Sequence, residues 1–473
     1  MKYIYTIIVL FFSTVLIAQS DDNILTLQDA VEMAIEKNIS IKNSELNLLN
    51  SELGKSDAIG NFLPRVSASA NHQWNIGRGI NITTNVIEDV TTSFSSMSAG
   101  FGLDVYNGFR NVYQLHRANL EILASKYQLD DMKDDIKLLV ANSYLQIMFN
   151  SEILKVQKSQ LEITKVEYAR TKDLIEIGTF SPRQIFEIEA NLASQVQSLV
   201  QSETATRLSL IRLAHSLLIT DYENFDIADV NFNVPLSQIL LEKPKKIFEK
   251  SLTLRNDIKV AATNIEIAKT DIDLAKGALL PTLSAFYNYN TRISYSDRFI
   301  ETGNFIETPI GVVKENGSLV VTQFPERSIT DPLSFGDQFR QNDGHSYGLA
   351  LNIPIFNGLS IKNNIKRRKL NLKRSETQFE QTKLDLENTI NQAYNNAEGA
   401  FKFYEASEKT LKARKEAYFI AEKQFEAGVL NTFDLNQIKQ RYENAASDVV
   451  RAKFDYIFKL KVLEFYFGIT ISI

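Results

Sequence analysis

Apolar and polar side chains alternate along two segments of the chain, residues 96–105 and 346–355. Every second residue is apolar, from Met97 to Val105 and from Tyr347 to Ile355, and most residues between them are small or polar. A period of two predicts β-strands with one apolar and one polar face, and about 10 residues are enough to cross a tilted path through a bilayer. We predict strands at about 63–76, 93–106, 281–293 and 346–356.

A second pattern places apolar residues seven positions apart in long stretches without proline. One series is Val140, Ile147, Leu154, Leu161, Tyr168 and Ile175. The other is Ile390, Ala397, Tyr404, Leu411, Tyr418 and Phe425. A sustained seven-residue repeat indicates coiled-coil helices. We predict long helices at about 109–176, 182–218, 359–426 and 432–467, so the fold class is α+β and mainly α.

These patterns occur twice in the chain. Leu63-Pro64 recurs as Leu280-Pro281, an offset of 217 (280 minus 63). Asn107-Gly108 recurs as Asn357-Gly358, an offset of 250 (357 minus 107). The additional 33 residues (250 minus 217) belong to a long polar loop at about 294–345 in the second copy. Each copy presents strands that cannot close on themselves, so the strands need neighbours.

The duplication predicts the domain organisation. The first repeat covers 21–220, the second covers 247–473, and a linker at 221–246 contains Pro235 and Pro244. Residues 1–20 read as a signal peptide, with Lys2 followed by an apolar stretch too short to span a membrane as a helix. We therefore expect the mature protein to leave the cytoplasm.

The turn that ends each long helix is specified by a few residues. In the first copy Gly178 suits a left-handed helix end, Ser181 suits an N-cap, Pro182 suits the first turn, and Gln184 would complete a capping box. Gly428, Asn431 and Asp434 occupy the same offsets in the second copy. We predict that these residues form the tips of two helical hairpins.

Composition excludes several classes of function. The chain has no cysteine, so disulfides, thiolate metal sites and a Cys lipid anchor are excluded. A net charge of -5 with mixed signs gives no footprint for nucleic acid. The histidines stand far apart, without metal-ligand spacing: His72, His116, His215 and His345. We expect no enzyme activity, no metal and no cofactor.

Two simpler interpretations compete with the interpretation of the chain as a membrane protein. The strand segments can be half of a soluble sheet, although soluble sheets rarely alternate with helices about 100 Å long. The chain can also be a secreted coiled-coil tether without a pore, but a tether needs no strand with an apolar outer face. Trp74 suits a membrane interface or ordinary packing equally well.

The Leu-Pro strand starts, the Asn-Gly junctions and the two glycine turns, in this order in both copies, resemble the TolC family of outer-membrane efflux proteins. The resemblance covers nearly the whole mature chain. It implies a homotrimer with a 12-stranded outer-membrane β-barrel, four strands from each protomer, continued by a coiled-coil helical barrel through the periplasm. It implies an exit duct in outer-membrane lipid that works with a periplasmic adaptor and a proton-driven or ATP-driven inner-membrane pump, for efflux of small molecules or type I secretion of proteins.

The resemblance also points to a periplasmic gate. The aspartate that helps to form the family's constriction corresponds to Asp434, although an acid there also suits the cap and dipole of a helix N-terminus. Other family gate positions hold residues that differ from the familiar ionic latch: Gln437, Gln184, Phe425 and Leu430. Glu187, the first-copy counterpart of Gln437, offers a substitute charge.

Overall fold

The computed structural model describes residues 24–81, 86–228 and 238–469. The predicted signal peptide, residues 1–20, and part of the predicted linker, residues 229–237, lie outside the described residues. The chain divides into two compact units. The helical unit comprises Met1–Ser51, Leu120–Glu266 and Lys373–Ile473, and the strand unit comprises Glu52–Asn119 and Ile267–Leu372.

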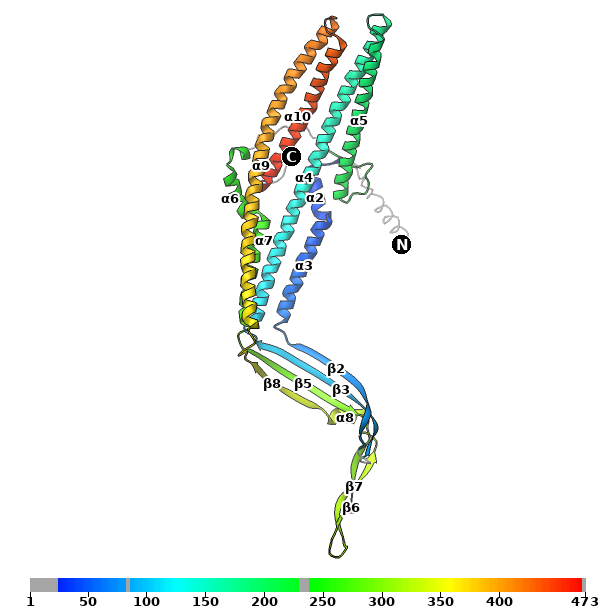
Figure 1. Cartoon of the computed structure of the whole chain (residues 1–473), viewed down its shortest axis with the longest axis vertical. Helices are drawn as coiled ribbons and strands as arrows, with labels where there is room; N and C mark the ends of the chain where they lie inside the picture. The colour runs from blue at the N-terminus through cyan, green and yellow to red at the C-terminus, as the bar shows by residue number, and fades with distance from the viewer. Residues whose placement is uncertain (1–23, 82–85, 229–237, 470–473) are drawn as a thin grey trace, which may run out of the picture. The chain divides into compact units, whose positions relative to one another are not determined.

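Two long helical hairpins dominate the helical unit (Figure 1). They are formed by α4 (Arg110–Glu176) with α5 (Arg183–Ser216), and by α9 (Ser360–Glu426) with α10 (Thr432–Phe467). Helices α4 and α9 have 67 residues each, about 100 Å of helix at 1.5 Å per residue. Neither contains proline, and the one glycine inside α9, Gly399, costs only about 1 kcal/mol, so nothing stops helix propagation.

Shorter helices accompany the hairpins: α2 (Leu27–Lys37), α3 (Ile39–Gly60), α6 (Pro244–Leu254) and α7 (Asn256–Gly277). Two-residue strands β1 (Ile24–Leu25) and β4 (Asp226–Ile227) pair in parallel, and η1 (Gln238–Leu241) is a single 3₁₀ turn. The segment at 221–246, predicted as the linker between the repeats, is not without secondary structure. It holds β4 and η1, and Pro244 begins α6 because proline fits the first helical position.

The apolar core of the helical unit follows the seven-residue pattern. Val140 and Ile147 of α4 are 1% exposed and pack with α2, α3 and α5. Ile390 and Ala397 of α9 are 0% exposed and pack with η1, α6 and α10. Nearer the hairpin tips, the same series is only half-buried, as at Tyr418. The helices therefore pack most tightly about midway along their length.

The strand unit contains a four-stranded antiparallel sheet in the order β2-β3-β5-β8. The strands are β2 (Arg65–Asn81), β3 (Val86–Tyr106), β5 (Thr282–Ser294) and β8 (Gly344–Asn352). The first two strands are longer than the predicted 63–76 and 93–106, since they continue as a paired ribbon to Asn81 and Val86. Strand β8 ends before the predicted residue 356, because Pro354 has no N–H to donate.

Strand register sorts the sheet into two faces. Val66 pairs with Phe101, Phe101 with Tyr287, and Tyr287 with Tyr347, so these apolar and aromatic residues share one face. The neighbouring row, on the opposite face, is polar or small: Ser67, Gly100, Asn288 and Ser346. In the single chain Tyr347 is 81% exposed and Leu349 is 69% exposed. Within the described residues, the apolar face is thus left exposed along β8.

The predicted polar loop at 294–345 is not a loop. It contains a hairpin of β6 (Arg298–Val312) and β7 (Leu319–Thr330), followed by the short helix α8 (Phe335–Gln341) (Figure 1). Gly317 adopts a φ of +73° in the hairpin turn. The sequence pattern did not predict these strands, because a two-stranded ribbon exposes both faces to solvent and does not require apolar and polar residues to alternate.

Candidate functional site

The candidate site lies at the tips of the two helical hairpins, where the glycine turns are. Gly178 and Gly428 have φ values of +76° and +74°, in the left-handed region where a side chain is strained. At the second tip the N–H of Val429 donates to the carbonyl of Gln424 at 2.9 Å. The first tip repeats this bond. The two tips therefore share one type of helix end.

The helices that follow the turns are capped differently. Asn431 Oδ1 accepts a hydrogen bond from the N–H of Asp434 at 2.9 Å, and Asn431 Nδ2 donates to Asp434 Oδ2 at 2.8 Å. The predicted capping box of Ser181 and Gln184 is wrong. Pro182 itself takes the N-cap position, so Ser181 lies one residue too early and its Oγ accepts only from the N–H of Arg183, at 3.4 Å.

The predicted gate residues do not gather in one place within a single chain. Gln437 and Glu187 line one groove of about 540 Å³ between α5 and α10. Phe425 lies elsewhere, beside Leu435 and Ile188 in a cavity of about 40 Å³. Asp434 and Leu430 are half-buried, and Gln184 Oε1 is buried without a hydrogen bond from any described residue.

An aromatic contact and an ion pair join the two tips. The rings of Phe180 and Phe425 meet edge to face with centroids 5.7 Å apart. Arg170 of α4 lies 3.4 Å from Glu426 of α9, and Lys423 lies 2.9 Å from the same carboxylate. Hydrogen bonding from Lys423 lowers the pKa of Glu426. The tips are therefore held together by contacts that the sequence did not reveal.

Below the tips is a buried polar group that we call the Lys439 cluster: Lys439, Glu167, Glu443, Thr164 and Gln195. Lys439 Nζ lies 2.5 Å from Glu167 Oε2, 3.0 Å from Thr164 Oγ1 and 3.8 Å from Glu443 Oε1. Gln195 Nε2 donates to Glu443 Oε2 at 3.1 Å. These residues come from α4, α5 and α10, so the cluster ties one hairpin to the other.

Electrostatics inside the Lys439 cluster are unbalanced. Two carboxylates face one ammonium group, and burial raises the pKa of Glu443. Tyr418 OH of α9 donates to Glu167 Oε1 at 3.2 Å, and burial together with the Glu167 charge raises the pKa of this tyrosine. Binding a proton at Glu443 would remove the excess negative charge, which agrees with the direction of its pKa shift. The sequence hid the cluster because Glu167 and Lys439 are 272 residues apart.

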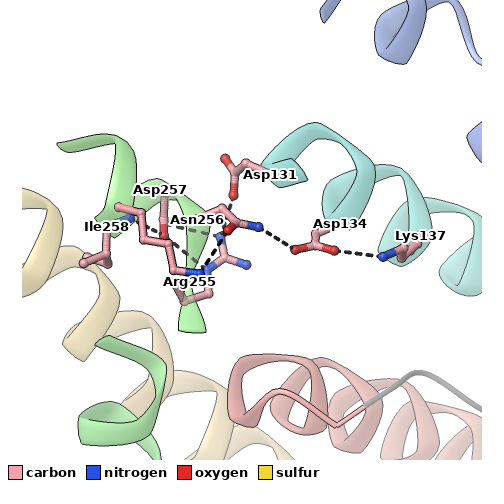
Figure 2. A network of polar contacts seen from close by, with 8 residues as sticks. Asp131, Asp134, Lys137, Arg255, Asn256, Asp257 and Ile258 are labelled. Carbon is pink, nitrogen blue, oxygen red and sulfur yellow. Dashed lines mark hydrogen bonds and ion pairs between the residues drawn. The ribbon is translucent and has the colours of Figure 1, made fainter. Parts of the chain in front are cut away.

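A second polar group, the Arg255 network, joins α7 to α4 (Figure 2). Arg255 contacts Asp257 at 3.3 Å and Asp131 at 3.4 Å, and Asn256 Nδ2 donates to Asp134 at 3.1 Å. Burial outweighs the attraction of Arg255 and raises the pKa of Asp131 to about 6. The guanidinium also lies 5.2 Å from the Phe465 ring centroid of α10. The network thus connects three helices.

The other residues singled out in the sequence lie away from the tips. Trp74 is 65% exposed on β2, with its ring 4.2 Å from that of His72. His345 Nδ1 is 2.8 Å from Tyr287 OH. In the part of the chain that the structure describes, no three acidic or histidine side chains gather into a possible metal site. Within those same residues, no helix is apolar over a long enough stretch to cross a membrane.

Comparison with protein families assigns the second half of the chain. Residues 247–468 match the family model described as outer membrane efflux protein. No curated protein matches the chain at a significant level.

Solved structures share the fold over nearly the whole chain. They include the outer membrane channel CmeC of Campylobacter jejuni, with a TM-score of 0.74, 16% identity, and coverage of 94% of this chain and 86% of that chain. The outer membrane protein VceC of Vibrio cholerae has a TM-score of 0.71 and 13% identity, with coverage of 94% of this chain and 97% of that chain. The open state of the MtrE outer membrane channel of Neisseria gonorrhoeae has a TM-score of 0.67 and 17% identity, with coverage of 94% of this chain and 89% of that chain. At these identities the similarity establishes the fold.

Proposed function

We propose that this chain belongs to the outer membrane efflux protein family, whose model matches residues 247–468, and that three copies of it form the exit duct of a pump complex that spans the cell envelope. The family is one of channels rather than enzymes. The protein is an outer-membrane efflux duct with a tunnel in the periplasm, as the resemblance to the TolC family implied. The trimer, the 12-stranded barrel and the partners belong to our proposal.

The open edges of the sheet support the trimer. Strands β2 and β8 stand at the two edges, and four strands are too few to close a barrel, since about eight are needed to enclose even a filled interior. The four strands alternate in direction, so β2 and β8 run oppositely. Joining β8 of one copy to β2 of the next therefore continues the antiparallel pattern, and three copies supply 12 strands.

The two faces of the sheet support a membrane barrel. A barrel in lipid needs an apolar outer face and tolerates a polar inner face against water. The row of Val66, Phe101, Tyr287 and Tyr347 fits lipid, and the row of Ser67, Gly100, Asn288 and Ser346 fits a water-filled lumen. A secreted tether without a pore has no use for the exposed apolar face. This uncovered face is the observation that carries the proposal.

We place the gate at the hairpin tips. In a trimer, Asp434 would contribute three carboxylates around the axis, and this ring would favour cations. Asn431 already orients the Asp434 carboxylate, so the cap and the gate can use the same side chain. Gln437 and Glu187 face one groove, while Gln184, Phe425 and Leu430 supply a largely uncharged closure.

The tips also suit contact with partner proteins. Ile177 is 73% exposed, Val429 is 77% exposed and Phe433 is 70% exposed, which is unusual for apolar residues on a helix end in water. We propose that a periplasmic adaptor covers them and links the duct to an inner-membrane pump, driven by protons or by ATP. The cargo is then small molecules in efflux or proteins in type I secretion, and the pump selects it.

Planar-bilayer conductance of the purified protein tests this function. Discrete channels support the duct, and a lower cation preference in Asp434→Ala supports the acidic ring. Asp173→Ala, which removes an exposed carboxylate of α4, is the matched control for lost charge. Channels that are indifferent to Asp434→Ala would refute the gate and keep the duct. A folded trimer that never conducts, even with the tips loosened by Phe180→Ala, would refute the duct.

A further inference from the structure

Strands at the two edges of the sheet differ greatly in length. Strand β2 has 17 residues and β8 has 9, so pairing of the two between copies leaves up to 8 residues of β2 beyond β8 (17 minus 9). Within one chain β8 also stops short of its partner β5. The last pair is Gly344 with Asn290, whereas β5 continues to Ser294.

Helix α8 takes the place of the missing part of β8. Gln338 Oε1 accepts from the N–H of Ser294 at 2.9 Å, and Gln338 Nε2 donates to the carbonyl of Ser294 at 2.8 Å. Asn342 Nδ2 donates to the carbonyl of Arg292 at 2.6 Å. The side-chain amide of Gln338 thus acts as a peptide group would in a neighbouring strand. Because these bonds satisfy the edge of β5, no strand needs to continue there.

One side of α8 packs on the apolar face of β5. Thr291 and Ile293 beneath it are 3% and 0% exposed, and the Tyr289 and Phe339 ring centroids are 6.2 Å apart. Phe335 stacks on Phe339 with rings inclined by 17° but stays 50% exposed. The short helix therefore presents one large apolar side chain that the described residues leave half exposed.

We infer that α8 is a docking surface for strand β2 of the neighbouring copy of this chain, an inference that rests on the trimer proposed above. Pairing Arg65 opposite Asn352 brings Leu351 opposite Val66, both on the apolar face. In this register β8 ends opposite Gln73, and the overhanging residues begin at Trp74. Trp74 and Ile76 are 65% and 80% exposed and share the apolar face with Val66.

The direction of the overhanging strand and the apolar character of its residues indicate that β2 of the neighbouring copy covers α8. The overhang of β2 leaves the end of β8 at the level where α8 covers β5, so a neighbouring β2 has α8 beside it rather than a strand. Phe335 then meets Trp74 or Ile76, which covers apolar residues that are exposed in the single chain. Lipid is the alternative cover for Phe335 and Trp74, and the test below separates it.

Paired cysteines test the contact directly, because the natural chain has no cysteine. Phe335→Cys is combined in one chain with Trp74→Cys or with Ile76→Cys, and oxidised in detergent and in outer-membrane vesicles. A disulfide needs Cβ atoms about 4 Å apart, so these pairs should give covalent dimers and trimers about tenfold more than control pairs. The controls are Phe335→Cys with Gln73→Cys or Asn75→Cys, whose side chains point to the opposite face.

Fluorescence of Trp74, the only tryptophan, provides a second readout. In the trimer, Phe335→Ala should shift its emission to the red. Trimers by light scattering without cross-links at positions 74 and 76 would overturn the inference while keeping the proposed trimer. Trp74 emission that ignores Phe335→Ala and is quenched by brominated lipid would show that lipid covers the site, also overturning it. A monomer in the membrane would instead overturn the proposed function.

Discussion

Asp131→Asn should make the stability of the protein less dependent on pH. In the Arg255 network the side chain of Asp131 is 27% exposed and lies 3.4 Å from Arg255 (Figure 2). Burial, together with Asp257 and other nearby carboxylates, raises its pKa from the ordinary 3.8 to about 6 despite the attraction of Arg255. The charged carboxylate is therefore less stable in the folded protein than in the unfolded chain.

The sign and size of the effect follow from proton linkage. Because the pKa is raised on folding, the proton on Asp131 stabilises the fold fully below pH 3.8, and this stabilisation is lost as the pH rises through about 6. A difference of about two pH units corresponds to about 3 kcal/mol at 1.36 kcal/mol per unit. The attraction of Arg255 is already contained in this value. Asparagine carries no charge at any of these pH values, so the variant should not lose this stability as the pH rises.

Urea unfolding followed by helical circular dichroism, at pH 4 and pH 8 in the same detergent, measures the effect. Between these pH values, the free energy of unfolding should fall by about 2 kcal/mol less in Asp131→Asn than in the natural protein, because pH 4 lies just above the ordinary pKa of 3.8 and part of the total of about 3 kcal/mol is already lost there. Asp173→Asn, at an exposed position on the same helix, controls for the lost charge. Equal pH dependence in Asp131→Asn and the natural protein would refute the reasoning. A steeper dependence would show that Arg255 outweighs burial.

Three further variants test the helical unit. Lys439→Met leaves two buried carboxylates without their ammonium group and should lower the free energy of unfolding by about 3–5 kcal/mol; adding Glu443→Gln should restore part of it, and no restoration would contradict the charge argument. Phe180→Ala removes a ring contact worth about 1 kcal/mol between the tips, so single-channel recordings should show more frequent opening, and unchanged gating would exclude the contact as a latch. Gly428→Ala places an alanine in the left-handed conformation, so it should lower the free energy of unfolding by about 1–2 kcal/mol and with it the melting temperature. Gly399→Ala lies inside α9, where alanine favours the helix, and should raise the melting temperature. Equal effects of the two substitutions would contradict the turn geometry.

The ends of the long helices and the apolar faces of the strands could be predicted from the sequence, because single residues or a local pattern determine them. Proline and glycine stop helices, so α4 and α10 begin and end within about two residues of the predicted bounds. Alternation in 96–105 and 346–355 also predicted which face of each strand is apolar, because a strand has a fixed period of two. These features depend on local chemistry alone.

Contacts between distant segments were not readable in the same way. The ion pair of Arg170 with Glu426 and the ring contact of Phe180 with Phe425 depend on how two hairpins pack, and charged helix surfaces offer many equivalent pairs. The capping box at Ser181 failed because Pro182 took the cap position. Helix α8 was missed because its Gln338 replaces a strand through a side chain, which no periodicity reveals.

The order of pairing in the sheet has a consequence for how the protein is made. Strand β3 pairs with β5, so Phe94 lies opposite Ser294, 200 residues later in the chain (294 minus 94). Pairing across such a separation carries a large loop-closure cost and is slow. The ribbon of β2 and β3 must therefore wait, with its apolar face in water, until the second half of the chain has been synthesised and delivered. A holding chaperone during transit would protect this face from aggregation, and its absence should reduce yield before it affects function.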